Sequence, residues 1–176
     1  ILNMNEISTI TNKKGEFEFN DLAPEKYYLT LDQSTYNRNY ITEQTLPLEI
    51  QIMPQKTDTL TINFIKPVRI NGKITYQETS QIQSNGFKNK LPQLIIKLDN
   101  GIDQFFTLAN ENGEYSFSEI KPGDWTISIV SKGLENKFEF VENNKSIKLR
   151  SGINETFHFL VKDKSRKINI KSSNIK

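Results

Sequence analysis

The chain has 176 residues and carries 23 Lys and Arg against 21 Asp and Glu, a formal net charge of +2. A charge this small, without a basic stripe interleaved with aromatic residues, argues against a nucleic-acid partner. The absence of cysteine excludes disulfides, thiolate zinc sites and a cysteine nucleophile, and nothing in the sequence resembles a membrane span. We therefore expect no enzyme, no cofactor, no metal site and no membrane insertion of this segment.

Alternating apolar and polar residues recur in short runs along the chain, separated by turns rich in Asn, Gly and Pro. A period of two predicts β-strands with one buried and one solvent-exposed face. Residues 1–7 have no such pattern and are interpreted as an irregular start, and Asn71-Gly72 as a bulge. The pattern predicts an all-β fold with strands at residues 17–19, 27–31, 46–52, 60–64, 68–76, 94–98, 106–108, 115–117, 125–129, 138–140, 147–149 and 157–161.

One stretch occurs twice. Residues 8–32 match residues 106–130, within the stretch 104–130, in the order of turn and apolar residues at a constant offset of 98 residues, as between Gly15 and Gly113. The matched positions include Phe17 with Tyr115, Phe19 with Phe117, Pro24 with Pro122, Tyr27 with Trp125, and Leu29 with Ile127. An offset of this size fits one small domain per repeat, so we expect a tandem array.

The repeat sets the expected domain boundaries. Residues 1–66 form a first β-sandwich unit, residues 67–164 a second, and residues 165–176 a tail. Arg166–Asn169 repeats Val68–Asn71 at the same offset, so the tail is interpreted as the first strand of a further unit. The same offset places the opening strand of the first unit before Ile1. We therefore expect its sheet to be incomplete, or to be completed by another segment or another chain.

These motifs carry a family resemblance. Gly-x-Tyr/Phe-x-Phe, followed by Leu/Ile-x-Pro and then Tyr/Trp-x-Leu/Ile, resembles the prealbumin-like, Ig-like β-sandwich repeats of bacterial surface proteins. These include carboxypeptidase regulatory-like domains, collagen-adhesin B-type repeats and the B repeats of serine-aspartate adhesins. The resemblance covers nearly the whole chain and implies tandem Ig-like sandwiches. It implies little about function, since such repeats serve as stalks, spacers and accessory domains.

Two chemistries of these relatives can be checked in this sequence. Some repeats form a Lys–Asn isopeptide bond with the help of a buried acid, but Leu31 and Ile129 occupy the strand where that acid is expected. Others bind Ca²⁺ in an acidic loop. The matching loop here, residues 77–90, has a single carboxylate, Glu78, and Ca²⁺ prefers several. We expect neither the bond nor the metal site.

A few residues are candidates for a role beyond packing. Aromatic residues in loops are better binding candidates than those in strands, so Tyr36, Tyr40 and Phe87 are the candidate partner contacts. Trp125 could stack on a sugar, but its alternation predicts a core position. The single histidine, His158, alternates out of phase with its apolar neighbours and should face solvent.

The functional expectation follows from the tandem repeats and from the lack of residues suited to catalysis or metal binding. We expect a non-catalytic stalk or spacer of a larger bacterial cell-surface protein, outer-membrane-associated or secreted, whose partners are other protein chains or other domains of a longer chain. The alternative is a carbohydrate- or peptide-binding module that uses loops 32–45 and 77–90. In the second unit, seven residues should be buried: Phe106, Leu108, Tyr115, Phe117, Trp125, Ile127 and Ile129.

Overall fold

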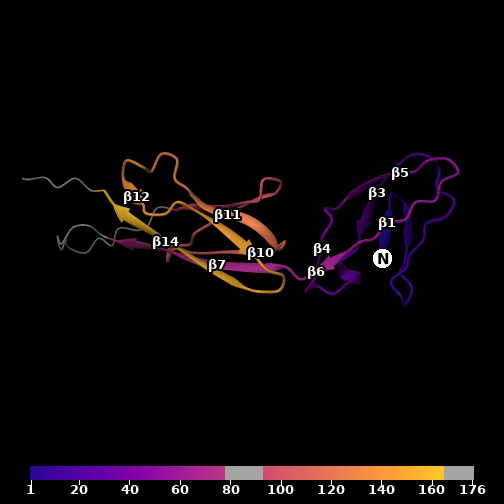
Figure 1. The fold of residues 1–176 in the computed structure, drawn as a ribbon, viewed down its shortest axis with the longest axis horizontal. Helices are drawn as coiled ribbons and strands as arrows, with labels where there is room; N and C mark the ends of the chain where they lie inside the picture. The colour runs from indigo at the N-terminus through magenta and orange to yellow at the C-terminus, as the bar shows by residue number, and fades with distance from the viewer. Residues whose placement is uncertain (78–92, 165–176) are drawn as a thin grey trace, which may run out of the picture. The chain divides into compact units, whose positions relative to one another are not determined.

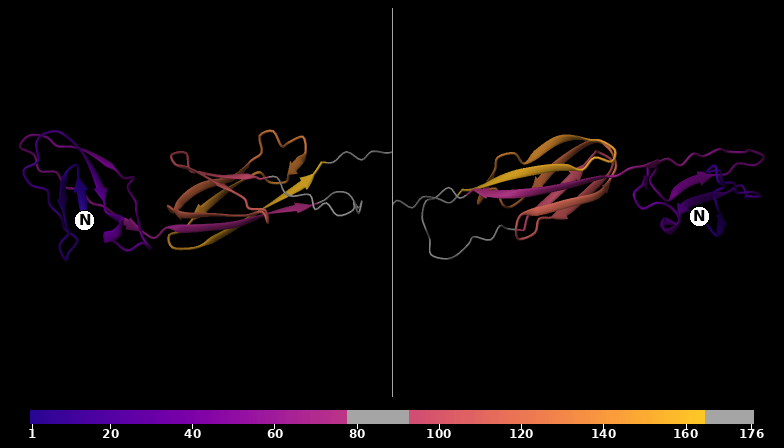
Figure 2. Two further views of the ribbon diagram at one scale, coloured as in Figure 1. Left: turned by 180° about the vertical axis from the view of Figure 1, so that it is seen from behind. Right: turned by 90° about the horizontal axis from the view of Figure 1, so that it is seen from below.

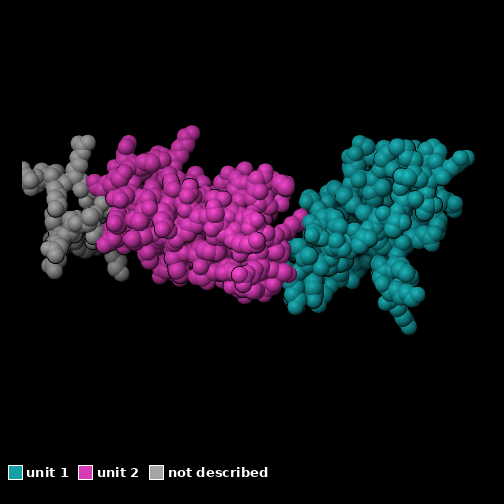
Figure 3. Space-filling view, in the orientation of Figure 1, with its two compact units in different colours: residues 1–67 teal, residues 68–176 magenta. Residues whose placement is uncertain are grey.

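The computed structural model describes residues 1–77 and 93–164 and contains two compact units, Ile1–Pro67 (unit 1) and Val68–Lys176 (unit 2) (Figures 1 and 3). Strands are nearly all of the regular secondary structure of the described residues in both units, so the predicted all-β class is confirmed. The single helix of the described ranges is the 3₁₀ turn η1 (Gln33–Thr35), and no helix there is long and apolar enough to cross a bilayer.

Unit 2 consists of two four-stranded sheets, whose layers can be followed in Figure 2. One sheet has the order β10-β7-β14-β12, and the other has the order β13-β11-β8-β9. Strand β7 is central in the first sheet, since it pairs antiparallel with β10 and parallel with β14. The strands are β7 (Val68–Gln77), β8 (Ile95–Asp99), β9 (Gln104–Leu108), β10 (Glu114–Ile120), β11 (Gly123–Val130), β12 (Phe138–Phe140), β13 (Asn144–Leu149) and β14 (Glu155–Asp163).

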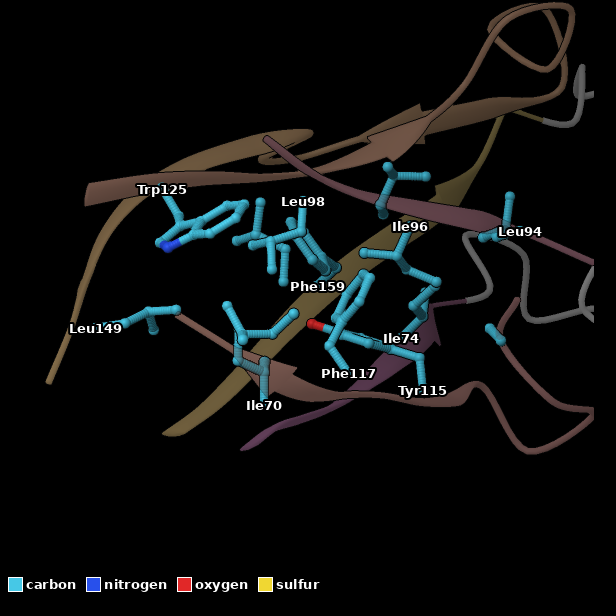
Figure 4. Packing of buried hydrophobic residues seen from close by; sticks show 14 of the residues in the cluster. Ile70, Ile74, Leu94, Ile96, Leu98, Tyr115, Phe117, Trp125, Leu149 and Phe159 are labelled. Carbon is cyan, nitrogen blue, oxygen red and sulfur yellow. The ribbon is translucent and has the colours of Figure 1, made fainter. Parts of the chain in front are cut away.

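The core of unit 2 lies between these sheets, where side chains from both layers point toward one another (Figure 4). Trp125 is 3% exposed, and Tyr115 and Phe117 make an edge-to-face ring pair with centroids 6.3 Å apart. Aromatic pairs of this geometry add to the stabilisation from burial. Five of the seven predicted core residues are buried as expected: Tyr115, Phe117, Trp125, Ile127 and Ile129.

The prediction was wrong for Phe106 and Leu108, which are 59% and 53% exposed. They lie on the edge strand β9, where the alternation has the opposite phase to the one expected. Ala109 is buried, and the Phe105 ring contacts Trp125 with centroids 5.8 Å apart. Because Phe105 and Phe106 are adjacent, the sequence pattern allows either of them to face the core. In the structure Phe105 does so, since its ring packs against Trp125.

Gly72 does not form the expected bulge. The ladder of β7 with β14 runs without interruption from Ile70 to Gln77, and the irregularity lies instead in β10, between Phe117 and Ile120. A side chain at Gly72 would overlap the Tyr115 ring and the carbonyl oxygen of Phe157. The glycine is therefore required for close packing.

Unit 1 has one four-stranded sheet, with the order β2-β1-β3-β5, and a separate pair formed by β4 and β6. Its first strand begins at Leu2, so the prediction of an irregular start at residues 1–7 was wrong. The strands of unit 1 are β1 (Leu2–Met4), β2 (Ile7–Thr9), β3 (Lys26–Leu31), β4 (Ile41–Thr42), β5 (Leu48–Gln51) and β6 (Phe64–Ile65).

The register of this sheet follows that of β9-β8-β11-β13 in unit 2. Leu29 pairs with Met4 as Ile127 pairs with Leu98, and Tyr27 pairs with Ile50 as Trp125 pairs with Ile147. Strand β1 thus has the place of β8, and no strand within residues 1–7 has the place of β7.

One strand predicted in unit 1 did not form, and a second formed only at its end. Residues 16–20, which carry Phe17 and Phe19, have no strand assignment, although the matching residues of unit 2 form β10. Of the strand predicted at residues 60–64, only Phe64 lies in a strand, β6 (Phe64–Ile65), which pairs with β4. In unit 2 the equivalents of both segments pair with β7, and a strand without a neighbour has no ladder to stabilise it.

Candidate functional site

Two of the three candidate partner contacts, Tyr36 and Tyr40, lie in the segment between β3 and β5 of unit 1. Both are half-buried. The Tyr36 ring packs against Phe64 with centroids 5.0 Å apart, and the Lys66 ammonium lies 6.0 Å from the centre of the Tyr40 ring. The third candidate, Phe87, lies outside the described residues, as does most of loop 77–90.

The chain is held locally at this segment by a capped turn. Asp32 precedes η1 and accepts hydrogen bonds from the Ser34 hydroxyl at 2.7 Å and from the Ser34 amide at 2.9 Å. These bonds stabilise the charged carboxylate, so the pKa of Asp32 lies below its usual value. The turn directs the chain toward Tyr36, which lies immediately after it at the C-cap position.

The loop tyrosines therefore contact residues of their own unit. The Tyr36 ring covers part of the exposed Phe64, and Tyr40 lies near the Lys66 charge, next to β6. Half-buried rings that contact their own unit present less area for stacking than free rings would. The structure brings Tyr36 and Tyr40 close to β6, one at Phe64 and the other at Lys66, a proximity that the sequence order alone does not show.

Unit 2 has a polar depression of about 620 Å³ on the outer face of the sheet that contains β8, β11 and β13. Thr126 lies opposite Asp99 on one neighbouring strand and Ser146 on the other, and Ser128 lies opposite Lys97 and Asn144. These side chains alternate with the buried residues of the same strands, which is why they point outward. Trp125 also borders the depression, but its ring is buried in the core, so it cannot serve as a sugar platform.

An ion pair organises one end of the depression. Lys97 Nζ lies 2.6 Å from Asp99 Oδ2, and the Gly101 amide donates to Asp99 Oδ1 at 2.7 Å. Both contacts favour the ionised carboxylate, so the pKa of Asp99 is lowered. The pair neutralises both charges at this end of the depression.

The other end of the same outer face is apolar. Leu108 lies opposite Ile95, and Ile95 lies opposite Val130, so three exposed apolar side chains form one row across β9, β8 and β11. The sequence pattern missed this row because it assigned Leu108 to the core.

The single histidine lies on the other sheet of unit 2. His158 is exposed as predicted, and its Nδ1 accepts a hydrogen bond from the Lys73 amide at 3.2 Å. Across the described ranges no polar or charged residue is buried, and no group of three or more His, Cys, Asp or Glu is placed to hold a metal ion. A Lys–Asn pair beside a buried acid, as the isopeptide bond requires, is thus not among the described core residues.

A scan against protein-family models found no match, and neither did a search of curated proteins. Solved structures similar to this chain include the minor pilin GBS52 of Streptococcus agalactiae, at 13% identity and a TM-score of 0.40, over 93% of this chain and 70% of that one. The Bacillus anthracis TIE protein is similar at 16% identity and a TM-score of 0.40, over 92% of this chain and 30% of that one. A streptococcal ancillary pilin is similar at 12% identity and a TM-score of 0.34, over 83% and 44%.

Proposed function

We propose that this chain is a non-catalytic structural segment, a stalk or spacer, of a longer bacterial protein that is secreted or displayed on the cell surface. The observation that carries the proposal is the arrangement of the chain as two β-units joined by a very short connection. Only Lys66 and Pro67 lie between β6 and β7. Proline fixes one backbone dihedral of this joint.

The chemistry of the units supports the same role. Their described cores are built from apolar side chains alone, and in the depression of unit 2 the Asp99 carboxylate is paired with Lys97. Such units maintain spacing and present surfaces to other proteins. In this proposal the partners are other protein chains or other domains of the longer chain.

The division of the chain into repeats of one type is also a proposal. Residues 1–66 and 67–164 are taken as two repeats of the prealbumin-like type, and residues 165–176 as the opening strand of a further repeat. The shared register of β2-β1-β3-β5 and β9-β8-β11-β13 supports it. Pilins, which are among the similar solved structures, would belong to the same broad class of surface proteins.

Small-angle scattering tests the spacer function. The chain is extended by one, two and three further copies of residues 67–164, each joined through its own Lys-Pro connection. We expect the maximum dimension to grow by a constant length per added unit. A particle whose units fold back on one another, with no such increment, would contradict a spacer.

A glycan array and a peptide library, probed with the same chains, test the alternative of ligand binding through loops 32–45 and 77–90. The spacer function predicts no saturable binding to either. Specific binding that is lost in a Tyr36→Ala and Tyr40→Ala double variant would favour the alternative.

The proposed location can be tested separately. Antibodies against residues 67–164 should label intact cells of the source organism, and labelling only after lysis would contradict surface display.

A further inference from the structure

The two sheets of unit 2 have four edge strands in the part of the unit that the structure describes. An edge strand presents unpaired backbone groups, and proteins protect such edges with charged side chains, bulges or very short strands. Three of the four edges have at least one of these features. Strand β13 carries Lys145 and Lys148, β10 carries Glu114 and an irregular register before Ile120, and β12 is three residues long around Glu139.

Strand β9 is the edge that has none of these features. Its sequence, Gln-Phe-Phe-Thr-Leu at residues 104–108, contains no charged residue and no proline, and its ladder with β8 is continuous over all five residues. Aromatic and β-branched residues favour strands, and uncharged segments without proline are the ones that pair readily with a further strand. Among the four edges, β9 is therefore the one best suited to accept a strand.

The backbone groups that β9 presents on its free side follow from its pairing. The Ala109 amide donates to the Leu94 carbonyl at 2.9 Å and so points toward β8. Successive residues of an antiparallel strand point their amide and carbonyl groups to opposite sides. The groups of Gln104, Phe106 and Leu108 therefore point away from β8, and no described strand pairs with them.

The outer face of this edge is apolar. Phe106 and Leu108 are largely exposed, and Ile95 and Val130 on the adjoining strands extend the same exposed surface. Contiguous exposed apolar side chains mark sites of protein contact. The matching strand of unit 1, β2, has Ser8 at the place of Phe106, at the offset of 98 and in the same register. The exposed aromatic ring is thus not a requirement of the strand itself.

We propose that two copies of the chain associate through β9, antiparallel about a two-fold axis beside Phe106. In this register Phe106 lies opposite its own counterpart, and Gln104 lies opposite Leu108 of the second copy. All three outward-pointing residues then exchange both backbone hydrogen bonds, and the two four-stranded sheets become one continuous sheet. A register centred on Thr107 would place Gln104 opposite Asn110, whose amide is already bonded within its own turn. The contact is isologous and closes at two copies.

The charges near β9 are compatible with this pairing. Lys97 lies opposite Phe106 on β8 and is already paired with its own Asp99. Three strand spacings would separate Lys97 from its counterpart, or about 14 Å, which exceeds the Debye length of about 8 Å at physiological ionic strength. Like charges therefore do not face one another across the contact, and the two Phe106 rings meet as a cross-strand aromatic pair.

Sedimentation of the full chain over a range of concentrations tests the association. We expect a reversible monomer–dimer equilibrium. Phe106→Lys should raise the Kd at least about tenfold, because it places two like charges directly opposite one another. Ile102→Lys makes the same change at an exposed residue in the turn before β9, and this matched control should associate like the parent. Both variants should keep the Trp125 fluorescence of the parent, since both side chains are exposed.

A parent chain that stays monomeric at every concentration, or an equal loss of association in the Ile102→Lys control, would overturn the proposal. The inference goes beyond the proposed spacer function and rests on β9 alone, so a monomeric chain would leave that function unaffected. The scattering increment, in turn, is measured at concentrations below the Kd of association and can fail while β9 still pairs.

Cysteine crosslinking tests the register, because the chain has no cysteine of its own. Gln104→Cys in one copy and Leu108→Cys in the other would lie opposite each other, with Cα atoms about 5.5 Å apart, a separation that a disulfide spans. Under mild oxidation, a mixture of the two single variants should give a crosslinked dimer, and each variant alone should not. No crosslink in the mixture, or an equal yield from either variant alone, would overturn the proposed pairing.

Discussion

Trp125 shows at the scale of a single residue how unit 2 is held together. Its ring is buried against Phe105, and its indole N–H donates to the Lys121 carbonyl at 2.9 Å. We expect Trp125→Ala to lower the free energy of unfolding of unit 2 by ~3–5 kcal/mol, as for other large-to-small core changes. Urea denaturation measures this loss. Ile102→Ala, at a side chain that is 91% exposed, is the control and should change little.

Gly72 is required for the opposite reason, because the structure leaves no room for a side chain at this position. A methyl group there would overlap the Tyr115 ring and the Phe157 carbonyl, in the middle of two ladders. Gly72→Ala should therefore destabilise unit 2 by about 1–3 kcal/mol, the usual cost of overpacking. The neighbouring exposed position supplies the control, Asn71→Ala. A gain in stability at Gly72→Ala would mean that the close packing of β7, β10 and β14 is not as described.

The Tyr115 hydroxyl links the stability of unit 2 to pH. It donates to the Phe157 carbonyl at 2.6 Å, and burial raises the pKa of Tyr115. A raised pKa in the folded state means that this stabilisation is complete below the unfolded pKa of about 10 and is lost as the pH rises above it.

The corresponding measurement is urea denaturation of unit 2 between neutral and alkaline pH, followed by Trp125 fluorescence. The parent should lose stability above about pH 10, the ordinary pKa of tyrosine. Tyr115→Phe should be less stable at neutral pH but should lose less as the pH rises. Identical alkaline slopes in the two proteins would show that Tyr115 does not titrate with unfolding.

At the scale of the strands, the alternating pattern predicted where strands form better than which of their faces is buried or which strands they pair with. It located β11, because Trp125, Ile127 and Ile129 are separated by polar residues. It failed for β9, where Phe105 and Phe106 are adjacent and only the contact with Trp125 decides between them. Local sequence carries no information on that contact, which depends on a strand some twenty residues away.

The orientation of β9, with Leu108 exposed and Ala109 buried, can be tested directly. Leu108→Asn should change the free energy of unfolding by no more than about 0.5 kcal/mol, because the side chain is on the exposed face. Ala109→Asp should destabilise unit 2 strongly, because a carboxylate would be buried without a partner. The phase expected from the sequence would reverse these two results. Thermal or urea unfolding of the two variants, compared side by side, decides between the phases.

Residues 16–20 show a limit of a different kind. The motif Gly-x-Tyr/Phe-x-Phe is shared with β10, yet it forms a strand only in unit 2, where β7 is its partner.

The geometry of the candidate site likewise could not be predicted from local sequence. Tyr36 and Tyr40 could be identified as loop aromatics from the sequence, but their contacts with Phe64 and Lys66 depend on the pairing of β4 with β6. Strand formation and site geometry both require neighbours that are distant in sequence.

For the whole molecule, the two units differ in how much apolar surface they bury. Unit 2 has two four-stranded sheets with sixteen buried residues between them, and unit 1 has one such sheet and four buried residues. Hydrophobic stabilisation scales with the apolar area removed from water. Unit 1 should therefore be the less stable unit, and the chain should not unfold as a single two-state system.

Two spectroscopic signals separate the units. The only tryptophan, Trp125, lies in unit 2, so its fluorescence reports that unit, whereas far-ultraviolet circular dichroism reports both. On heating, we expect circular dichroism to show an early transition that tryptophan fluorescence lacks, followed by a later transition common to both signals. Leu29→Ala, in the small core of unit 1, should shift only the early transition, and Ile127→Ala, its counterpart in unit 2, only the later one. Coincident transitions by both signals would contradict a unit 1 that is less stable than unit 2.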